Sequence, residues 1–251
     1  MAGTARGLEE VGEGAGGDRT VFLDALAEET VVAHLDEAYR RGARFRLISE
    51  ELGERDYGGQ DLVLVDPVDG SLNAKYGLPY FSIVLAVADG ERLGDVHLGY
   101  VANLVSGAEF HATFGQGACL DGGPLPRLER SRRDGRFGVV QLDGSKPAQG
   151  LQKVRALVDR AERLRILGSA ALNVCHTAVG GISLQIAPVP VRSFDLAGPL
   201  LILREAGGIA TDLDGNPLDD VRSTLDARTT VLAAHSRDDH ARALSLLRGE
   251  A

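Results

Sequence analysis

One short segment, Asp66-Pro67-Val68-Asp69-Gly70-Ser71, constrains this chain more than any other. It follows residues 62–65, an apolar run that predicts a buried strand. Side chains three apart point to opposite faces of a regular strand, but Pro67 donates no ladder hydrogen bond and predicts that the strand ends in a turn. The turn would bring Asp66 and Asp69 to one point, where carboxylate oxygens suit Mg²⁺ or Mn²⁺. An ordinary polar turn is the alternative, because these residue types dominate turns.

The composition indicates a globular protein and disfavours several classes of partner. Of 251 residues, 44% are hydrophobic and 25% are charged, which is ordinary for a globular fold. The net charge of −9 disfavours nucleic acid, but it allows a small phosphorylated substrate if bound cations reverse the local field. Cys119 and Cys175 lack zinc spacing and favour a reduced, cytoplasmic setting. The longest apolar run, residues 81–88, is too short to cross a membrane as a helix.

Two further acidic blocks accompany the central segment. Glu50 and Glu51 follow a short apolar run, and Asp195 lies within Ser193-Phe194-Asp195-Leu196-Ala197-Gly198, ahead of a Glu-Ala-Gly-Gly sequence. Alone, the Glu pair would be a solvated strand end and Asp195 a helix N-cap. Together, in this order, the three blocks resemble the inositol monophosphatase family, within the lithium-sensitive, Mg²⁺-dependent sugar-phosphatase superfamily.

The residues after the central segment narrow this resemblance. Ser71-Leu72-Asn73-Ala74, followed by Gly77-Leu78-Pro79, is similar to an archaeal and bacterial branch that includes dual inositol monophosphatase/fructose-bisphosphatase enzymes. The resemblance covers roughly residues 14–240. It implies a homodimer, although the helix that members usually carry before residue 18 is missing here or reduced to a glycine-rich start.

The predicted elements divide the chain into two halves. Over residues 1–143 we expect an α+β half with an antiparallel sheet; its predicted elements are a helix at 18–41, capped by Asp18 or Thr20, and strands at 45–49, 62–65, 79–88, 95–103, 108–114 and 137–142. Residues 127–136 are rich in arginine and predict a solvated connector, with a phosphate-binding patch as the alternative. Over residues 144–251 we expect an α/β half; its predicted helices are 148–160, 168–180, 194–206 and one capped by Ser236, and its strands are 163–167, 182–187 and 229–234. The resemblance implies a layered αβαβα sandwich.

The resemblance also implies a site for two divalent cations, Mg²⁺ with Mn²⁺ as the alternative. Glu50 is implied both as a metal ligand and as a catalytic residue. It would hold the first ion with Asp66 and the carbonyl of Val68, while Asp66, Asp69 and Asp195 would hold the second. Two such ions can polarise a phosphoryl group, activate a water and relieve charge on the leaving oxygen.

The resemblance further implies that Ser71 and Asp24 activate the attacking water, because the family pairs a hydroxyl after Asp-Gly with an acid on an early helix. Thr20 and Asp24 fit the spacing found there. On its own, Asp24 would be a surface acid on a helix.

Substrate contacts are expected on both sides of the metal ligands. The amides of Gly70 and Ser71 would bind the phosphate. The resemblance implies four more contacts, at Gly168, Ser169, Ala170 and Arg192. Gln185 stands where inositol-phosphate enzymes carry an acid that contacts sugar hydroxyls. Gln keeps the hydrogen bonding and loses the charge, which predicts an altered substrate choice.

The function that follows is an Mg²⁺-dependent phosphomonoesterase acting on a small sugar or polyol phosphate. The alternatives within the superfamily are a fructose-1,6-bisphosphatase and a nucleotide 3′-phosphatase. The alternative of another class is a catalytically silent protein that binds a phosphorylated ligand or a partner.

Overall fold

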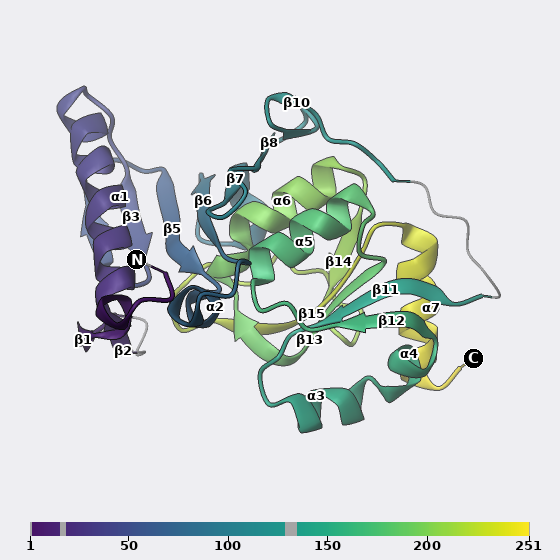
Figure 1. The fold of residues 1–251 in the computed structure, drawn as a ribbon. Helices are drawn as coiled ribbons and strands as arrows, with labels where there is room; N and C mark the ends of the chain where they lie inside the picture. Colours follow the sequence, from purple (N-terminus) through teal and green to yellow (C-terminus); the bar gives the residue numbers. More distant parts are fainter. Residues whose placement is uncertain (1, 16–18, 129–134, 251) are drawn as a thin grey trace.

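The chain folds around two large β-sheets with helices in three layers (Figure 1). The computed structural model describes residues 2–15, 19–128 and 135–250. The first sheet has the strand order β10-β9-β8-β7-β6-β5-β3-β4, and only β3 and β5 among its described neighbours run parallel. Its strands are β3 (Arg46–Ser49), β4 (Gly53–Asp56), β5 (Leu62–Asp69), β6 (Ser82–Ala88), β7 (Val96–Asn103), β8 (Glu109–Thr113), β9 (Ala118–Leu120) and β10 (Gly123–Pro124).

The second sheet has the order β12-β11-β13-β15-β14. Its strands are β11 (Phe137–Leu142), β12 (Ala161–Arg165), β13 (Leu184–Arg192), β14 (Ile209–Thr211) and β15 (Arg228–Ala234). β11 runs parallel to β12 and β13, and β15 runs antiparallel to β13 and β14. Because β11 already belongs to this sheet, the chain changes sheets between Pro124 and Phe137. The division at residue 143 stays a prediction.

The helices fill the layers outside and between the two sheets. They are α1 (Phe22–Arg40), α2 (Ser71–Tyr76), α3 (Pro147–Lys153), α4 (Arg155–Asp159), α5 (Ala170–Val179), α6 (Ala197–Glu205) and α7 (Arg237–Arg248), with 3₁₀ helices at Ala5–Leu8, Leu93–Asp95 and Phe194–Leu196. α1 packs on the outer face of the first sheet, α5 and α6 lie between the sheets, and α3, α4 and α7 cover the far face of the second sheet (Figure 1). The predicted αβαβα sandwich is confirmed.

The middle layer forms the largest core cluster. Buried side chains of both sheets, such as Val84 and Val231, meet Leu201 of α6 in one cluster. Helix α6 can lie directly on β7 because two glycines meet at the crossing. A Cβ added to Gly99 would lie only 2.5 Å from the carbonyl oxygen of Gly198. This close approach holds the start of α6 against the first sheet, directly after the 3₁₀ helix that carries Asp195.

Several element boundaries differ from those predicted. α1 begins at Phe22 and its N-cap is Val21, whose side chain makes no capping bond. Thr20 lies in β2 (Arg19–Val21), which pairs with β1 (Glu10–Glu13), and Asp18 lies outside the described residues. The predicted helix at 148–160 is two helices, because Val154 leaves helical geometry between α3 and α4. The predicted Ser236 cap of α7 is confirmed by its bond from the amide of Asp239.

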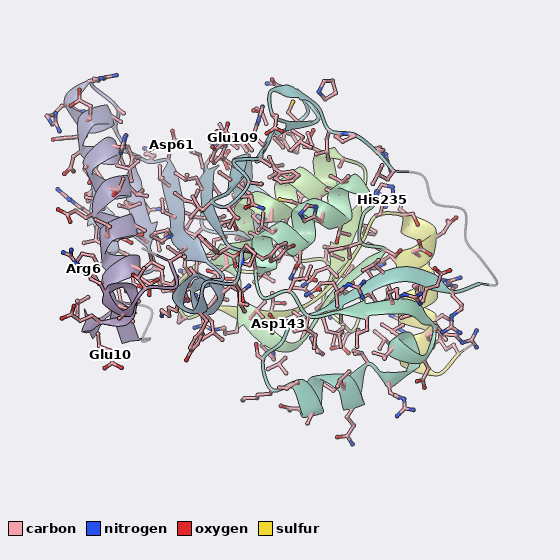
Figure 2. The ribbon with its side chains drawn as sticks, in the orientation of Figure 1. Arg6, Glu10, Asp61, Glu109, Asp143 and His235 are labelled. Carbon is pink, nitrogen blue, oxygen red and sulfur yellow. The ribbon has the colours of Figure 1, made fainter. Side chains whose placement is uncertain are left out.

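The segment before α1 packs against that helix and also bonds α2 and the residue after Glu50, through Gly3 and Ala15. The guanidinium of Arg6 lies 4.8 Å from the ring centroid of Phe22, so that the segment before α1 packs against the start of that helix (Figure 2). In the predicted basic connector, residues 129–134 lie outside the described residues. Among the helices that the structure describes, none has the length and apolar character needed to span a membrane.

Candidate active site

A β-bulge in β5 brings Asp66 and Asp69 to the same side of the strand. The strand does not end at Pro67 as predicted but continues to Asp69, where it still pairs with β6. Asp66 lies opposite Val84 and Asp69 opposite Ser82, so three steps along β5 match two along β6. One extra residue inverts the alternation of side chains, and a bulge accommodates a proline that donates no ladder bond. The predicted convergence of the two acids therefore has a different cause from the one expected.

Asp69 is held by the start of α5, about a hundred residues further along the chain. Its Oδ1 accepts the amide of Ala170 (3.0 Å), and its Oδ2 accepts the amide of Ala171 (3.0 Å) and the hydroxyls of Ser82 (3.1 Å) and Ser169. An acid at a helix N-terminus also interacts favourably with the helix dipole. Ser169 and Ala170 thus position a predicted metal ligand. Ser169 is only 1% exposed, whereas Ala170 is half-buried, and their expected contact with substrate stays a prediction.

Gly70 lets the chain turn from β5 into α2 next to this contact. Its φ of +88° lies in the left-handed region, and an added Cβ would lie 2.9 Å from the carbonyl oxygen of Gly168. Asn73 of α2 donates to the carbonyl oxygens of Leu167 (2.6 Å) and Tyr80 (2.8 Å). These contacts join α2 to the segment that precedes α5, so that Ser71 and Asp69 keep a fixed relation.

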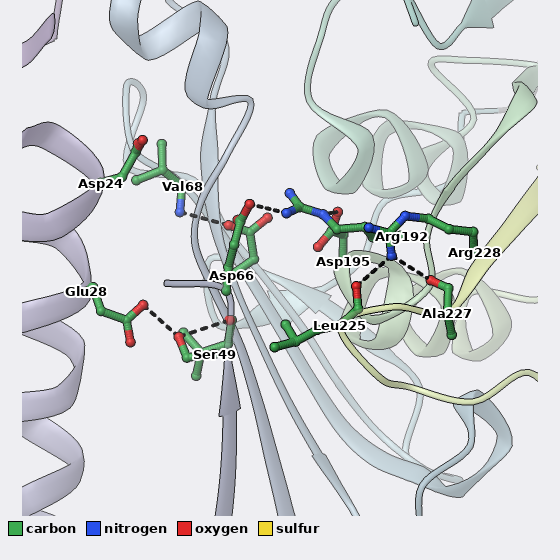
Figure 3. A network of polar contacts seen from close by, with 12 residues as sticks. Asp24, Glu28, Ser49, Asp66, Val68, Arg192, Asp195, Leu225, Ala227 and Arg228 are labelled. Atoms are coloured by element: carbon green, nitrogen blue, oxygen red, sulfur yellow. Dashed lines mark hydrogen bonds and ion pairs between the residues drawn. The ribbon is translucent and has the colours of Figure 1, made fainter. Parts of the chain in front are cut away.

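The other acids gather around Arg192 at the end of β13 (Figure 3). Its Nε lies 3.1 Å from Asp195 Oδ2, and its guanidinium also pairs with Glu50, which follows β3. Asp66 is close enough to both acids for their charges to act on it. One arginine therefore faces three carboxyl groups from three separate segments of the chain.

Burial and mutual repulsion raise the pKa values of these acids. Desolvation is the largest cause of the raised pKa of Asp66, followed by the charges of Asp195, Glu50 and Asp69. Burial likewise raises the pKa of Asp195 to about 7, although Arg192 opposes the shift. Burial raises the pKa of Asp69 as well, against the hydrogen bonds from α5. The folded protein thus keeps these carboxyl groups together at a cost in free energy.

The cluster has the chemistry of a divalent-cation site. Asp66 Oδ2 and Asp195 Oδ1 are buried and have no hydrogen-bond partner within the described part of the chain. Oxygen ligands with excess negative charge suit Mg²⁺ or Mn²⁺. Within the described ranges, no three acid, histidine or cysteine side chains already stand at metal-holding spacing, and two of the acids are engaged by Arg192. The donor set therefore fits a cation, provided that the side chains close on it.

We expect the stability of the protein without added metal to fall as the pH rises from 5 to 8. Because the pKa values of Asp66 and Asp195 are raised in the folded state, protonation of these groups favours the folded over the unfolded protein. This contribution is complete at pH values below those at which carboxyl groups ordinarily titrate, and it is lost as the pH rises through about 7. Each pKa unit corresponds to about 1.4 kcal/mol, so Tm should fall by roughly several degrees. Thermal unfolding in a chelator checks this, and Mg²⁺ should restore more Tm at pH 8 than at pH 5. A Tm that rises with pH in chelator would contradict the expectation.

A cavity of about 250 Å³ opens beside the acids. Its lining includes Asp24, Glu50, Val68, Ser71, Lys75 and Arg192. Asp24 is 4% exposed and extends from α1, while Ser71 and Lys75 lie one turn apart on α2. The cavity is thus lined by the predicted water-activating residues and, of the acids around Arg192, by Glu50.

The structure places Ser71 and Asp24 at the same cavity but does not show the hydrogen bond expected between them. Asp24 Oδ2 instead pairs with Lys75 Nζ at 3.1 Å, and among the described residues Asp24 Oδ1 has no hydrogen-bond partner. Lys75 was not predicted. A signal was present, because on a helix Lys75 shares the face of Ser71 four residues earlier.

Gln185 lies away from this cavity, which contradicts its predicted contact with substrate. It is 2% exposed and pairs in register with Gln141 of β11 and Ala233 of β15. Two residues on from it, on the same face of β13, Ala187 packs in the core under α5 and α6. The sequence offered no local signal for this, since the orientation of a strand residue depends on which face the neighbouring helices cover.

The sequence matches the inositol monophosphatase family over residues 6–250. It is 31% identical to the fructose-1,6-bisphosphatase/inositol-1-monophosphatase of Methanothermobacter thermautotrophicus, over 96% of this chain and 89% of that protein. It is also 31% identical to the inositol-1-monophosphatase of Aeropyrum pernix, over 86% of this chain and 82% of that protein. A crystal structure described as an inositol monophosphatase–fructose 1,6-bisphosphatase superposes with a TM-score of 0.80, at 26% identity, over 96% of this chain and 91% of that one.

Proposed function

The chain belongs to the inositol monophosphatase family, and on this basis we propose that it is an Mg²⁺-dependent phosphatase that hydrolyses the phosphomonoester of a small sugar or polyol. The observation that supports the chemistry is the set of buried, unpartnered carboxylate oxygens of Asp66 and Asp195 beside an open cavity. A site for a neutral ligand, or for one held only through its hydroxyl groups, does not require so many carboxyl groups close together. A phosphoryl group approaches it only when cations intervene.

The metal ions would be held by four carboxyl side chains and one backbone carbonyl, those of Glu50, Asp66, Asp69, Asp195 and Val68. The ions would supply polarisation of the phosphoryl group, a more acidic water and charge relief at the leaving oxygen. Family membership supports metal dependence in general, and the oxygen-only donor set favours Mg²⁺, with Mn²⁺ as the alternative.

The protein's own groups orient the reactants around those ions. Ser71 and Asp24 would hold the attacking water and accept its proton, with Lys75 fixing the carboxylate of Asp24. Arg192 and the amides of Gly70 and Ser71 would hold the phosphate. Asp69 is oriented by the start of α5 before any substrate binds, which lowers the reorganisation needed for the reaction.

The substrate class follows from the relatives rather than from any single contact. Both relatives described above are named as inositol-1-monophosphatases, and the one from Methanothermobacter thermautotrophicus is also named as a fructose-1,6-bisphosphatase, so fructose 1,6-bisphosphate is the second candidate substrate. Phosphate release should be measured with Mg²⁺ over inositol phosphates, fructose 1,6-bisphosphate, other sugar phosphates and nucleoside 3′-phosphates. Turnover confined to the nucleotides would point to the 3′-phosphatase alternative. No release from any of them, with folded protein and Mg²⁺, would favour a catalytically silent binding protein.

We expect Gln185→Glu to leave the preference among sugar phosphates unchanged. The side chain is buried in the second sheet, so an added charge there would not meet substrate hydroxyls. It should instead lower Tm, because burying an unpaired charge costs free energy. The ratio of kcat/KM for inositol monophosphate to that for fructose 1,6-bisphosphate checks this. A shift of about tenfold or more toward inositol monophosphate would show that Gln185 faces the substrate after all.

The homodimer and the cytoplasmic setting also remain proposals. Membership of the family supports a small phosphorylated ligand as the partner. The cytoplasmic setting is supported by Cys119 and Cys175, which form no disulfide. Sedimentation at micromolar concentration would test the dimer directly.

A further inference from the structure

Glu28 is a buried acid that the proposed reaction does not use. It lies four residues after Asp24 on α1, so both side chains share the face of the helix that packs on the first sheet. Asp24 reaches the cavity, whereas Glu28 reaches the end of β3 (Figure 3). Glu28 is 8% exposed, while its neighbour Glu29 is exposed on the solvent side of the same helix.

The contacts of Glu28 bracket the predicted metal ligand Glu50. The hydroxyl of Ser49 donates to Glu28 Oε2 at 2.7 Å, and the backbone amide of Glu51 is close enough to favour the ionised form of the same carboxyl group, while Glu28 Oε1 has no hydrogen-bond partner among the described residues. Glu28 therefore bonds the residue before Glu50 and acts electrostatically on the backbone amide of the residue after it.

The same contacts extend to the neighbouring strand. The hydroxyl of Ser49 lies 3.3 Å from the carbonyl oxygen of Val65, the residue immediately before Asp66, and the amide of Glu50 donates to that oxygen at 3.3 Å. The end of β3, which Glu50 follows, is thus joined to β5 just before Asp66, and Glu28 ties that point to α1.

A carboxylate is a costly way to fill space between a helix and a sheet. An apolar side chain of similar volume would pack there without losing its hydration. An acid that accepts from Ser49 and attracts the amide of Glu51 does what an apolar group cannot, because it holds the chain on each side of Glu50.

We propose that Glu28 is a positioning residue for Glu50, which it holds in the orientation that metal binding requires. The inference rests on the proposed function, since it needs Glu50 to be a metal ligand. Residues that orient metal ligands typically change metal affinity by about 10- to 100-fold when they are replaced.

The test compares Glu28→Gln and Glu28→Ala with the matched control Glu29→Ala. Two readouts are the Mg²⁺ concentration for half-maximal phosphate release and the rise of Tm with Mg²⁺ concentration, which needs no turnover. For Glu28→Ala we expect the half-saturating Mg²⁺ to rise about tenfold or more, with kcat at saturating Mg²⁺ changed far less. Glu28→Gln keeps the volume and one acceptor, so it should fold and show a smaller shift. Glu29→Ala should match the wild type in both readouts.

Ser49→Ala removes the same hydrogen bond from the other side. It should shift the Mg²⁺ dependence in the same direction, and the double variant should cost less than the two single losses combined. A lower Tm with unchanged half-saturating Mg²⁺ in both Glu28 variants would overturn the proposal, because Glu28 would then serve the fold alone. Wild-type protein that neither gains Tm nor activity with Mg²⁺ would overturn the proposed function itself.

Discussion

Asp66→Asn is expected to reduce phosphate release by about a thousandfold or more, because metal ions contribute several kcal/mol to such reactions. Asp66 occupies the centre of the acid cluster, where the charges of Asp195, Glu50 and Asp69 all act on it. Asn keeps the shape and one acceptor for the amide of Val68, which bonds Asp66 Oδ1 at 3.0 Å. The loss would therefore reflect the missing charge and not a change of fold.

Measurements of stability distinguish a missing charge from a change of fold. At pH 8 the variant removes a buried charge whose pKa is raised by burial, so its Tm in chelator should equal or exceed that of the wild type. The rise of Tm with Mg²⁺ should be largely lost. Asp61→Asn is the matched control, because this exposed acid lies just before β5 and should leave both readouts unchanged (Figure 2). A kcat for Asp66→Asn within about threefold of the wild type, or full wild-type turnover in chelator, would contradict the metal-dependent mechanism.

The second large effect is expected for Ser71 and Asp24. Ser71→Ala should lower kcat by about 10²- to 10⁴-fold, the usual range for general-base assistance, while the Mg²⁺-induced rise of Tm persists. Ser71→Thr should remain active, because it keeps the hydroxyl. Asp24→Asn should resemble Ser71→Ala, and the double variant should cost little more than either single change if the two act as a unit. Fully additive losses in kcat would show that they act separately.

Lys75 provides the control that the sequence alone did not suggest. Asp24→Asn also breaks the ion pair with Lys75, which is 3.1 Å long and largely buried. Lys75→Met breaks the same pair and leaves Asp24 in place. A loss of kcat in Lys75→Met as large as that in Asp24→Asn would assign the effect to the ion pair and not to proton transfer by Asp24.

Much of the fold could be predicted because its signals are local. The apolar run at residues 62–65 indicates a strand without reference to the rest of the chain. Ser236 caps α7 by accepting a hydrogen bond from the amide three residues later. The short strands β1, β2, β4, β9, β10 and β14 were missed, since each has only two to four residues and depends on a neighbouring strand for its hydrogen bonds. The single helix predicted over 148–160 failed at Val154, where the tertiary packing overrides local propensity.

The sequence by itself indicated which acids could serve the site, because the three blocks that carry Glu50, Asp66, Asp69 and Asp195 resemble those of the family. Only the tertiary structure decided how they meet. The bulge in β5 needs β6 as its partner before Asp66 and Asp69 can share a side. Asp69 accepts bonds from the start of α5, and Ser49, the residue before Glu50, bonds Glu28 on α1. A hydrogen bond between distant segments produces no periodic pattern in the sequence, because each partner fits the helix or strand pattern of its own segment whether or not the other partner is present.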